Sequence, residues 1–157
     1  MNAGPGGERP PRVAVVIPCY RVADHLGGVI RSVPASCEVI ICVDDASPDD
    51  VAGAVAAAGD PRVLCLRHDA NRGVGAAVKT GWMEALARGA DIIVKLDGDG
   101  QMDGRDIDTL IAPLVQGWAD FAKGNRFVHQ AALRAMPHAR LAGNAMLSLG
   151  VKAVSGY

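Results

Sequence analysis

The sequence contains few aromatic residues, no marked excess of charge and no long apolar run. Phe, Trp and Tyr make up 4% of its 157 residues, too few for rows of side chains that stack on single-stranded nucleic acid. A formal net charge of −1 argues against the basic face of a nucleic-acid binder. No stretch approaches the roughly 18 apolar residues that indicate a membrane span. We therefore expect no nucleic-acid partner, and membrane contact only at the periphery or through segments missing from this chain.

The chain has four cysteines, and no two of them form a C-x-x-C pair. The four residues are Cys19, Cys37, Cys42 and Cys65. No histidine lies at zinc-ligand spacing from them. We interpret them as buried free thiols in a reducing cytosol, and we assign Cys19, which lies near a strand end, to packing as well. The expected location is cytoplasmic, including the cytoplasmic face of a membrane.

The chain has enough apolar residues for a core and one clear change in composition. Half of the residues are hydrophobic, and the length favours one domain. Residues 1–11 are rich in glycine and proline and lack the apolar core of a signal peptide. We expect a disordered tail over residues 1–11 and a folded domain over residues 12–157.

Apolar runs alternate with helix-like segments along this domain. Such alternation predicts an α/β fold in which a mainly parallel, Rossmann-like sheet lies between helices in three α/β/α layers. The expected strands cover residues 12–17, 37–43, 62–66, 90–96 and 120–123. The expected helices cover residues 23–33, 49–58, 75–88, 107–116 and 133–154.

Several local signals refine this prediction. Pro18 is expected to end the first strand, and Ser47 before Pro48 matches the N-cap and first position of the second helix. In the third helix an apolar residue recurs at every fourth position, which predicts the stripe facing the core: Val78, Trp82 and Leu86. The histidines are scattered, and we interpret them as surface or internally hydrogen-bonded residues: His25, His68, His129 and His138.

Polar residues follow the predicted strands at their carboxyl ends. In parallel sheets these ends meet at one edge, and ligands bind there. The residues concerned are Pro18 and Tyr20, Asp44 and Asp45, the segment 67–75, and Asp97 and Asp99. Their gathering at one edge supports a binding site more strongly than any single motif does.

The most informative of these segments is Asp97-Gly98-Asp99-Gly100-Gln101, directly after the apolar residues 92–96. The glycines let the chain turn, so both carboxylates can converge on one small, hard cation. Proteins hold such a cation with one or two carboxylates plus substrate phosphates. A solvated acidic turn is the structural alternative. An EF-hand that starts at Asp99 is excluded, because its twelfth position is Leu110 instead of glutamate.

A phosphatase of the haloacid dehalogenase type is a rival interpretation of the same segment. It also uses a strand that ends in Asp-x-Asp, with the first aspartate, here Asp97, as the nucleophile. In that class the motif follows the first strand and continues with Thr or Val. Here it follows the fourth strand and continues with Gly100-Gln101, which counts against this rival.

Two other strand-end segments allow both a binding and a structural interpretation. The segment Asp44-Asp45-Ala46-Ser47 can accept hydrogen bonds from a base or ribose, or can cap the following helix. The amides of the glycine-containing segment 71–75, with Arg72 and Lys79, can hold a diphosphate, although an ordinary turn is the simpler explanation when it is taken alone. It is neither a dinucleotide fingerprint nor a P-loop, which needs glycine at Val78.

The order and spacing of these motifs resemble glycosyltransferase family 2, in particular its polyprenyl- and dolichyl-phosphate sugar synthase-like branch. The resemblance covers about residues 13–157. The segments that carry it are Val15–Tyr20, Val43–Ser47, Asn71–Gly81, Leu96–Gln101 and Gly124–Phe127.

This resemblance implies a GT-A fold, a nucleotide-diphosphate-sugar donor, and Mg²⁺ or Mn²⁺ as cofactor. It also implies inverting transfer to a polyprenyl phosphate or to a glycan of the cell envelope. The expected donor-binding residues are Pro18, Tyr20, Asp44, Asp45, Arg72, Gly73, Lys79, Asp97 and Arg126. The expected metal ligands are Asp97, Asp99 and Gln101.

The chain departs from the family pattern in two places. Arg21-Val22 stand where the family often has Asn-Glu, which removes one acidic donor contact. The sequence ends at Tyr157, where similar proteins continue into an Asp-Pro segment that carries the base, so we expect the catalytic base beyond Tyr157. The leading hypothesis is a transferase whose present chain binds donor but transfers poorly. The alternatives are the phosphohydrolase that uses Asp97 and a non-catalytic nucleotide-sugar-binding fragment.

Overall fold

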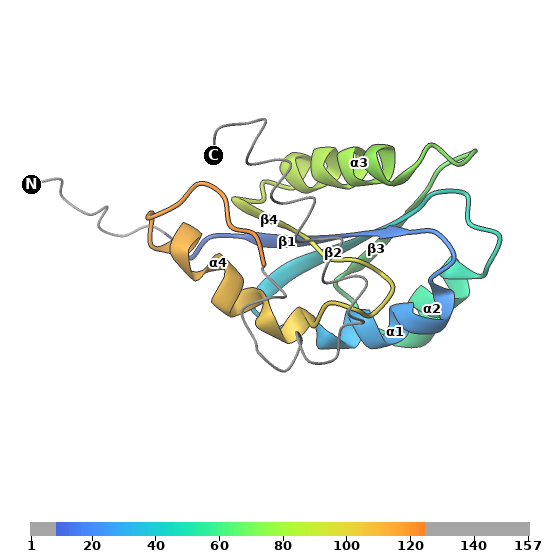
Figure 1. Cartoon of the computed structure of the whole chain (residues 1–157), viewed down its shortest axis with the longest axis horizontal. Coiled ribbons are helices and arrows are strands. Elements are labelled where there is room, and N and C mark those ends of the chain that lie inside the picture. Colours follow the sequence, from blue (N-terminus) through green and yellow to red (C-terminus); the bar gives the residue numbers. More distant parts are fainter. Residues whose placement is uncertain (1–8, 125–157) are drawn as a thin grey trace, which may run out of the picture. The chain divides into compact units, whose positions relative to one another are not determined.

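Strands and helices alternate along residues 9–124, which the computed structural model describes (Figure 1). The elements are β1 (Val13–Cys19), α1 (Ala23–Ser32), β2 (Cys37–Asp44), α2 (Val51–Ala58), β3 (Val63–Arg67), α3 (Val74–Ala87), β4 (Ile92–Lys95), a 3₁₀ turn (Gly104–Asp106) and α4 (Ile107–Val115). The predicted order is confirmed as far as α4, but the strand expected at 120–123 does not form. The helix expected at 133–154 lies outside the described residues.

The four strands form one parallel sheet in the order β3-β2-β1-β4. Strand β1 lies inside the sheet, where Val15 is opposite Ile40 of β2 and Val94 of β4. Strand β3 pairs with β2 and forms one edge. Because the strands all run in one direction, their carboxyl ends meet along one edge, as the sequence predicts.

Helices cover both faces of this sheet, with α3 on one face and α1, α2 and α4 on the other (Figure 1). Successive residues of β1 point to opposite faces. Val15 and Ile17 enter the larger core with Ile30 of α1, whereas Ala14 and Val16 enter the core beneath α3. The predicted three-layer α/β/α arrangement is thus confirmed.

Helix α3 lies on the sheet through small residues. Ala77, Gly81 and Ala85 are its buried positions. A Cβ atom at Gly81 would lie 2.3 Å from Cγ1 of Val16, so only glycine permits this close approach to β1.

The apolar stripe predicted for α3 is wrong. Trp82 and Leu86 are 48% and 58% exposed, and Val78 is half-buried. The apolar and the small residues both recur at every fourth position. The small residues face the sheet because they let the backbone of α3 approach β1 closely.

Two predicted boundaries are also corrected. Pro18 does not end β1, because β4 stops opposite Val16 and Pro18 lies where β1 has a neighbour on one side only. Helix α2 is capped by Asp50, whose carboxylate accepts a hydrogen bond of 2.8 Å from the amide of Gly53. Ser47 is therefore not the cap of this helix.

The cysteines are free thiols, as predicted, and Cys19, Cys37 and Cys42 are buried. Cys65 is exposed, which corrects the prediction for that residue, because β3 is an edge strand. A hydrogen bond with Cys42 and burial raise the pKa of Cys19, so its thiol stays protonated and packs in the core.

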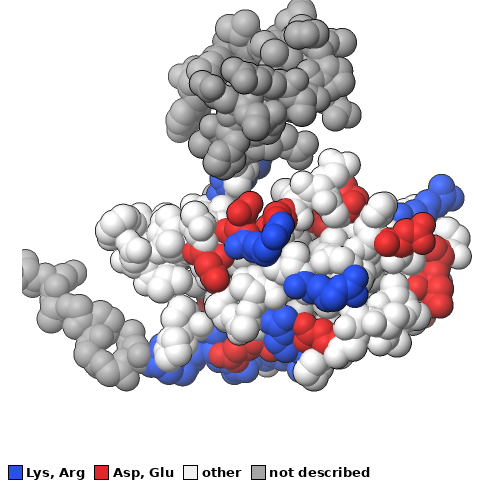
Figure 2. Space-filling view, turned by 90° about the horizontal axis from the view of Figure 1, so that it is seen from below, with Lys and Arg blue, Asp and Glu red and all other residues white. Residues whose placement is uncertain are grey.

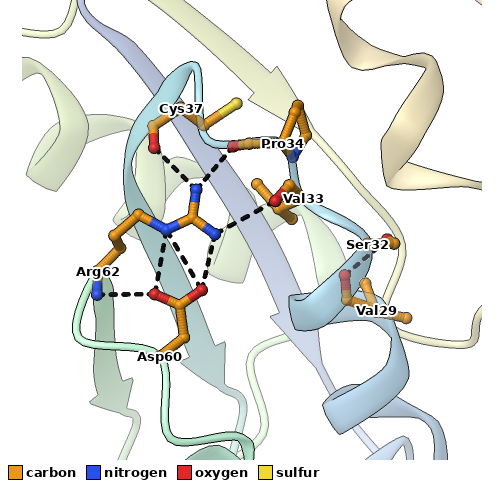
Figure 3. Close-up of polar contacts among 7 residues, drawn as sticks. All are labelled: Val29, Ser32, Val33, Pro34, Cys37, Asp60 and Arg62. Carbon is orange, nitrogen blue, oxygen red and sulfur yellow. Dashed lines mark hydrogen bonds and ion pairs between the residues drawn. The ribbon is translucent and has the colours of Figure 1, made fainter.

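A guanidinium group joins three segments at the amino ends of the strands (Figure 3). Arg62 Nη1 donates to the carbonyl oxygens of Pro34 at 2.6 Å and Cys37 at 3.0 Å, and Nη2 donates to that of Val33 at 3.2 Å. Nε and Nη2 also bind the Asp60 carboxylate, with Nη2–Oδ2 at 2.7 Å. These bonds satisfy carbonyl groups between the C-cap of α1 and the start of β2, and the bond from Arg62 lowers the pKa of Asp60.

The face formed by α1, α2 and α4 carries acidic and basic side chains interspersed with uncharged surface (Figure 2). Exposed ion pairs such as Arg12–Glu38 at 2.8 Å add little stability, since water and salt screen them.

Within residues 9–124, no helix is both long enough and apolar enough to cross a bilayer.

Candidate functional site

The loops after β1 and β2 are joined to each other at the carboxyl edge of the sheet. Ser47 Oγ accepts a hydrogen bond of 2.7 Å from the amide of Arg21, and Asp49 Oδ2 accepts one of 2.8 Å from the amide of Ala23. Arg21 and Ala46 have φ angles of 56° and 52°, which non-glycine residues rarely adopt. These bonds hold both loops in a conformation that costs backbone strain, a common feature of binding sites.

Asp44, at the end of β2, is 1% exposed and has two kinds of partner. Its Oδ1 accepts a hydrogen bond of 2.7 Å from the amide of Ser47. Its Oδ2 accepts one of 2.7 Å from Nη1 of Arg67, whose side chain is 61% exposed. An exposed arginine can swing away without cost in burial, so this oxygen can be made available to a ligand.

Asp45 is 2% exposed, and its partners belong to the chain's own interior. The amides of Arg72 and Gly73 donate to its two oxygens at 2.9 and 2.7 Å, and His68 Nδ1 lies 2.7 Å from Oδ1. Burial alone would raise the pKa of Asp45, but the bonds from Arg72, His68 and Gly73 outweigh it and lower the pKa. This carboxylate is therefore ionised and fixes the loop before α3.

His68 continues this cluster from β2 to α3. It is 8% exposed, and its Nε2 lies 2.9 Å from Oγ1 of Thr80. The sequence prediction of a surface or internally bonded histidine missed this link, since Asp45 and Thr80 are 23 and 12 residues away along the chain. An isolated histidine directly after a strand was the only signal in the sequence.

Pro18 and Tyr20 lie at the end of β1, between the strand ends of β2 and β4. The Tyr20 ring is 43% exposed, and the Arg21 guanidinium lies 5.5 Å from its centroid, a cation–π contact. The ring is thus an accessible flat surface at the edge where ligands bind in such sheets.

The acidic turn after β4 is more accessible than the Asp44–Asp45 pair. Asp97 forms an ion pair with Lys95, and the two side chains are 36% and 35% exposed. Asp99 is exposed, and its Oδ1 accepts a hydrogen bond of 3.0 Å from the amide of Gln101. Gly98 is buried, with the position of its missing Cβ 3.0 Å from Val22, so the turn lies close against the loop after β1.

The chemistry of this turn fits a divalent cation such as Mg²⁺ or Mn²⁺. Carboxylate oxygens are the ligands that such hard ions prefer, and two carboxylates suffice when substrate phosphates complete the shell. Within residues 9–124, no group of three or more His, Cys, Asp or Glu side chains could hold a metal. Asp97 and Asp99 supply two such carboxylates, which leaves the rest of a cation's shell to other ligands.

Arg72 and Lys79 lie apart from this turn, toward the β3 side of the sheet. Both line a pocket of about 510 Å³ that Thr80 and Met83 of α3 also border. The structure thus gathers the predicted residues into two groups. Asp45 and Gly73 are joined by a hydrogen bond, and Asp44 lies beside Asp45 with partners of its own, Ser47 and Arg67. Asp97, Asp99 and Gln101 share a turn two strands away. Arg126 lies outside the described residues.

A known protein family matches nearly the whole chain, and it is the family that the motifs resemble. The family described as Glycosyl transferase family 2 matches residues 14–153. A polyprenol monophosphomannose synthase from Mycolicibacterium smegmatis is 35% identical over 83% of this chain and 51% of its own length. A UDP-N-acetylglucosamine–dolichyl-phosphate N-acetylglucosaminyltransferase from Methanococcus voltae is 28% identical over 92% of this chain and 64% of its own length. The chain thus spans between half and two thirds of these relatives.

Solved structures match the fold. A mycobacterial protein is 27% identical with a TM-score of 0.53, covering 68% of this chain and 38% of that one. Glucosyl-3-phosphoglycerate synthase from Mycobacterium tuberculosis, solved with Mn²⁺, UDP and phosphoglyceric acid, is 22% identical with a TM-score of 0.55. That match covers 67% of this chain and 39% of that one.

The parallel sheet with helices on both faces is that of the glycosyltransferases with a GT-A fold. Since the family matches residues 14–153, the chain belongs to glycosyltransferase family 2.

Proposed function

We propose that this chain is the donor-binding part of a metal-dependent, inverting glycosyltransferase. The donor is a nucleotide-diphosphate sugar, and the acceptor is a polyprenyl- or dolichyl-type lipid phosphate. The names of the relatives from M. smegmatis and M. voltae support this acceptor class. Such an acceptor favours action at the cytoplasmic face of a membrane.

The observation that carries the proposal is a contrast among the carboxylates at the carboxyl edge. Asp44 and Asp97 are each paired with a partly or largely exposed cation, Arg67 and Lys95. A ligand can displace these cations, whereas the partners of Asp45 are backbone amides and a buried histidine. The edge therefore offers two exchangeable carboxylates, one for a nucleoside and one for a metal-bound diphosphate.

The proposed roles follow from these positions. Asp44 accepts hydrogen bonds from the base or ribose, beside Pro18 and the exposed ring of Tyr20. Asp97 and Asp99, with Gln101 as a further oxygen donor, would hold the metal, which would neutralise charge on the leaving diphosphate. Arg72, Gly73, Lys79 and Arg126 complete the candidate anion contacts.

The chemistry places few demands on the residues of this chain. An acceptor oxygen attacks the anomeric carbon from the face opposite the leaving nucleotide, so the configuration inverts. A phosphate acceptor is already ionised and needs little help from a base, whereas a hydroxyl acceptor needs one. The chain's task is to hold the donor so that the bond to the diphosphate can break.

Calorimetry and a transfer assay test the proposal together. UDP- and GDP-sugars are titrated with Mn²⁺ into the 157-residue chain, and sugar transfer to a polyprenyl phosphate is followed separately. We expect binding that requires Mn²⁺ and weak or no transfer. Failure of every nucleotide to bind with metal would contradict the donor-site assignment, and robust transfer would contradict the proposal that these 157 residues act as the donor-binding part.

The phosphohydrolase alternative loses its support, because the chain belongs to glycosyltransferase family 2. A phosphohydrolase would form a covalent aspartyl-phosphate on Asp97, which mass spectrometry after incubation with phosphate esters would detect. A fragment that only binds donor stays distinguishable, since it shows binding without turnover even when a longer chain is assayed.

A further inference from the structure

We propose that His68 is a positioning residue that joins Asp45 to Thr80 and thereby fixes the loop that begins α3. The inference rests on the proposed donor site and deepens it by assigning a role to a buried histidine that donor chemistry does not use. Three segments meet at this residue: the loop after β2, the loop after β3, and α3 itself.

The protonation of His68 follows from its partners. A carboxylate can only accept hydrogen bonds, so the contact of 2.7 Å between Nδ1 and Asp45 requires a proton on Nδ1. In the neutral ring Nε2 is then an acceptor, and the Thr80 hydroxyl donates to it across 2.9 Å. The imidazolium keeps both contacts with the direction of the second reversed.

The backbone holds the ring in this place. The amide of His68 donates to the carbonyl oxygen of Asp44 at 2.8 Å, which extends the β2–β3 pairing by one residue. With the main chain fixed and the side chain 8% exposed, the imidazole has little freedom except to bridge Asp45 and Thr80.

Asp45 transmits this position to the loop. It binds the amides of Arg72 and Gly73, and Gly73 is the N-cap of α3 with a φ of 85°. Loss of the histidine leaves a buried carboxylate with fewer donors, which favours opening of the loop toward water. The backbone that carries Arg72 and Lys79 beside the pocket is then less firmly held.

A matched pair of threonine variants tests the link without disturbing the core. Thr80→Val keeps the shape and removes the hydroxyl, whereas Thr80→Ser keeps the hydroxyl. We expect Thr80→Val and His68→Phe to speed amide hydrogen exchange at Arg72 and Gly73 about tenfold or more, with Thr80→Ser close to the wild type. The variants that open the loop are expected to weaken binding of UDP or GDP with Mn²⁺.

The tautomer of His68 provides a readout independent of nucleotide. Nitrogen-15 NMR of the full chain is expected to show the proton on Nδ1 in the neutral ring. A proton on Nε2 alone, or unchanged exchange at Arg72 and Gly73 in Thr80→Val, would overturn the proposal. If the wild type binds no nucleotide, the proposed function fails, while exchange and tautomer still decide the role of His68.

Discussion

Two polar clusters lie at opposite ends of the same sheet and differ in how their charges are satisfied. At the amino ends, Arg62 directs its guanidinium to Asp60 and to three backbone carbonyl groups (Figure 3). At the carboxyl ends, Oδ2 of Asp44 and the carboxylate of Asp97 are paired with the exposed cations Arg67 and Lys95.

The difference separates a structural role from a binding role. The Arg62 cluster is closed, because a ligand could enter only by breaking bonds that hold α1, β2 and β3 together. The carboxyl-end cluster is open at Asp44 and Asp97 and closed at Asp45, where backbone amides and His68 are the partners. Buried charge alone does not mark a site; exchangeable partners do.

The largest expected effect is on stability, at the closed cluster. Arg62→Met removes the guanidinium donors to Asp60 and to the carbonyl groups of Val33, Pro34 and Cys37, and is expected to lower the free energy of unfolding by about 3 kcal/mol. Urea denaturation measures this loss. Arg88→Met, which removes only the exposed pair with Glu84, is the control and should cost about 0.5 kcal/mol or less. An equal loss of stability in Arg62→Met and Arg88→Met would contradict the structural role assigned to the Arg62 cluster.

The next largest effect is expected where α3 packs against the sheet. Gly81→Ala places a Cβ against Val16 and is expected to cost about 1–3 kcal/mol of stability. It should also speed exchange at the Gly73 amide, because displacement of α3 moves Thr80 away from His68. Gly75→Ala in the same helix meets no atom within 4 Å and is expected to be neutral or stabilising. Tolerance of alanine at Gly81 would contradict the close packing described for α3.

A smaller effect is expected on lowering the pH, and it involves both clusters. The pKa values of Asp45 and Asp60 are lowered in the folded chain, so the unfolded chain binds more protons in acid. Their contribution is complete above the unfolded aspartate pKa of about 3.9 and is lost as the pH falls through the lower, folded values. Urea denaturation from pH 6 to pH 2.5 should show this loss, with a shallower dependence in Asp60→Asn. A free energy of unfolding that increases as the pH is lowered from 6 to 2.5 would contradict the lowered pKa values of Asp45 and Asp60.

The smallest effect is expected at the open cluster. Lys95→Met frees the Asp97 carboxylate from its competing cation and should tighten Mn²⁺ binding in the presence of UDP about threefold, or about 0.7 kcal/mol. Arg88→Met, which removes an exposed cation paired with Glu84 and given no role in the site, is the comparison variant and should leave Mn²⁺ binding unchanged. Weaker Mn²⁺ binding in Lys95→Met would show that Lys95 assists the site instead of competing with the metal.

The order of elements as far as α4, and the edge at which the candidate residues gather, were predictable from the sequence. Alternation of apolar runs and helix-like segments predicted the parallel sheet, and Asp44 and Asp97 lie at or just after the carboxyl ends of β2 and β4, as expected. These predictions succeed because they depend on neighbours in sequence.

The features that could not be predicted from the sequence depend on contacts between segments that are distant along the chain. In α3 the apolar and the small residues share a period, and only the distance to Val16 decides that Gly81 faces the sheet. Ser47 resembles a helix cap until its hydroxyl is seen to bind the amide of Arg21 in another loop. His68 acquires its role from Asp45 and Thr80, which no local pattern connects to it.

The central claim is that the Asp97 turn binds a nucleoside diphosphate through a divalent metal. Titration of Mn²⁺ followed by electron paramagnetic resonance, with and without UDP or GDP, tests it most directly in the wild type and in Asp97→Asn. We predict that nucleotide and Mn²⁺ strengthen each other's binding in the wild type, and that Asp97→Asn weakens this coupled binding about tenfold or more while the chain stays folded. Nucleotide binding that is equally tight without metal, or unchanged in Asp97→Asn, would contradict the claim.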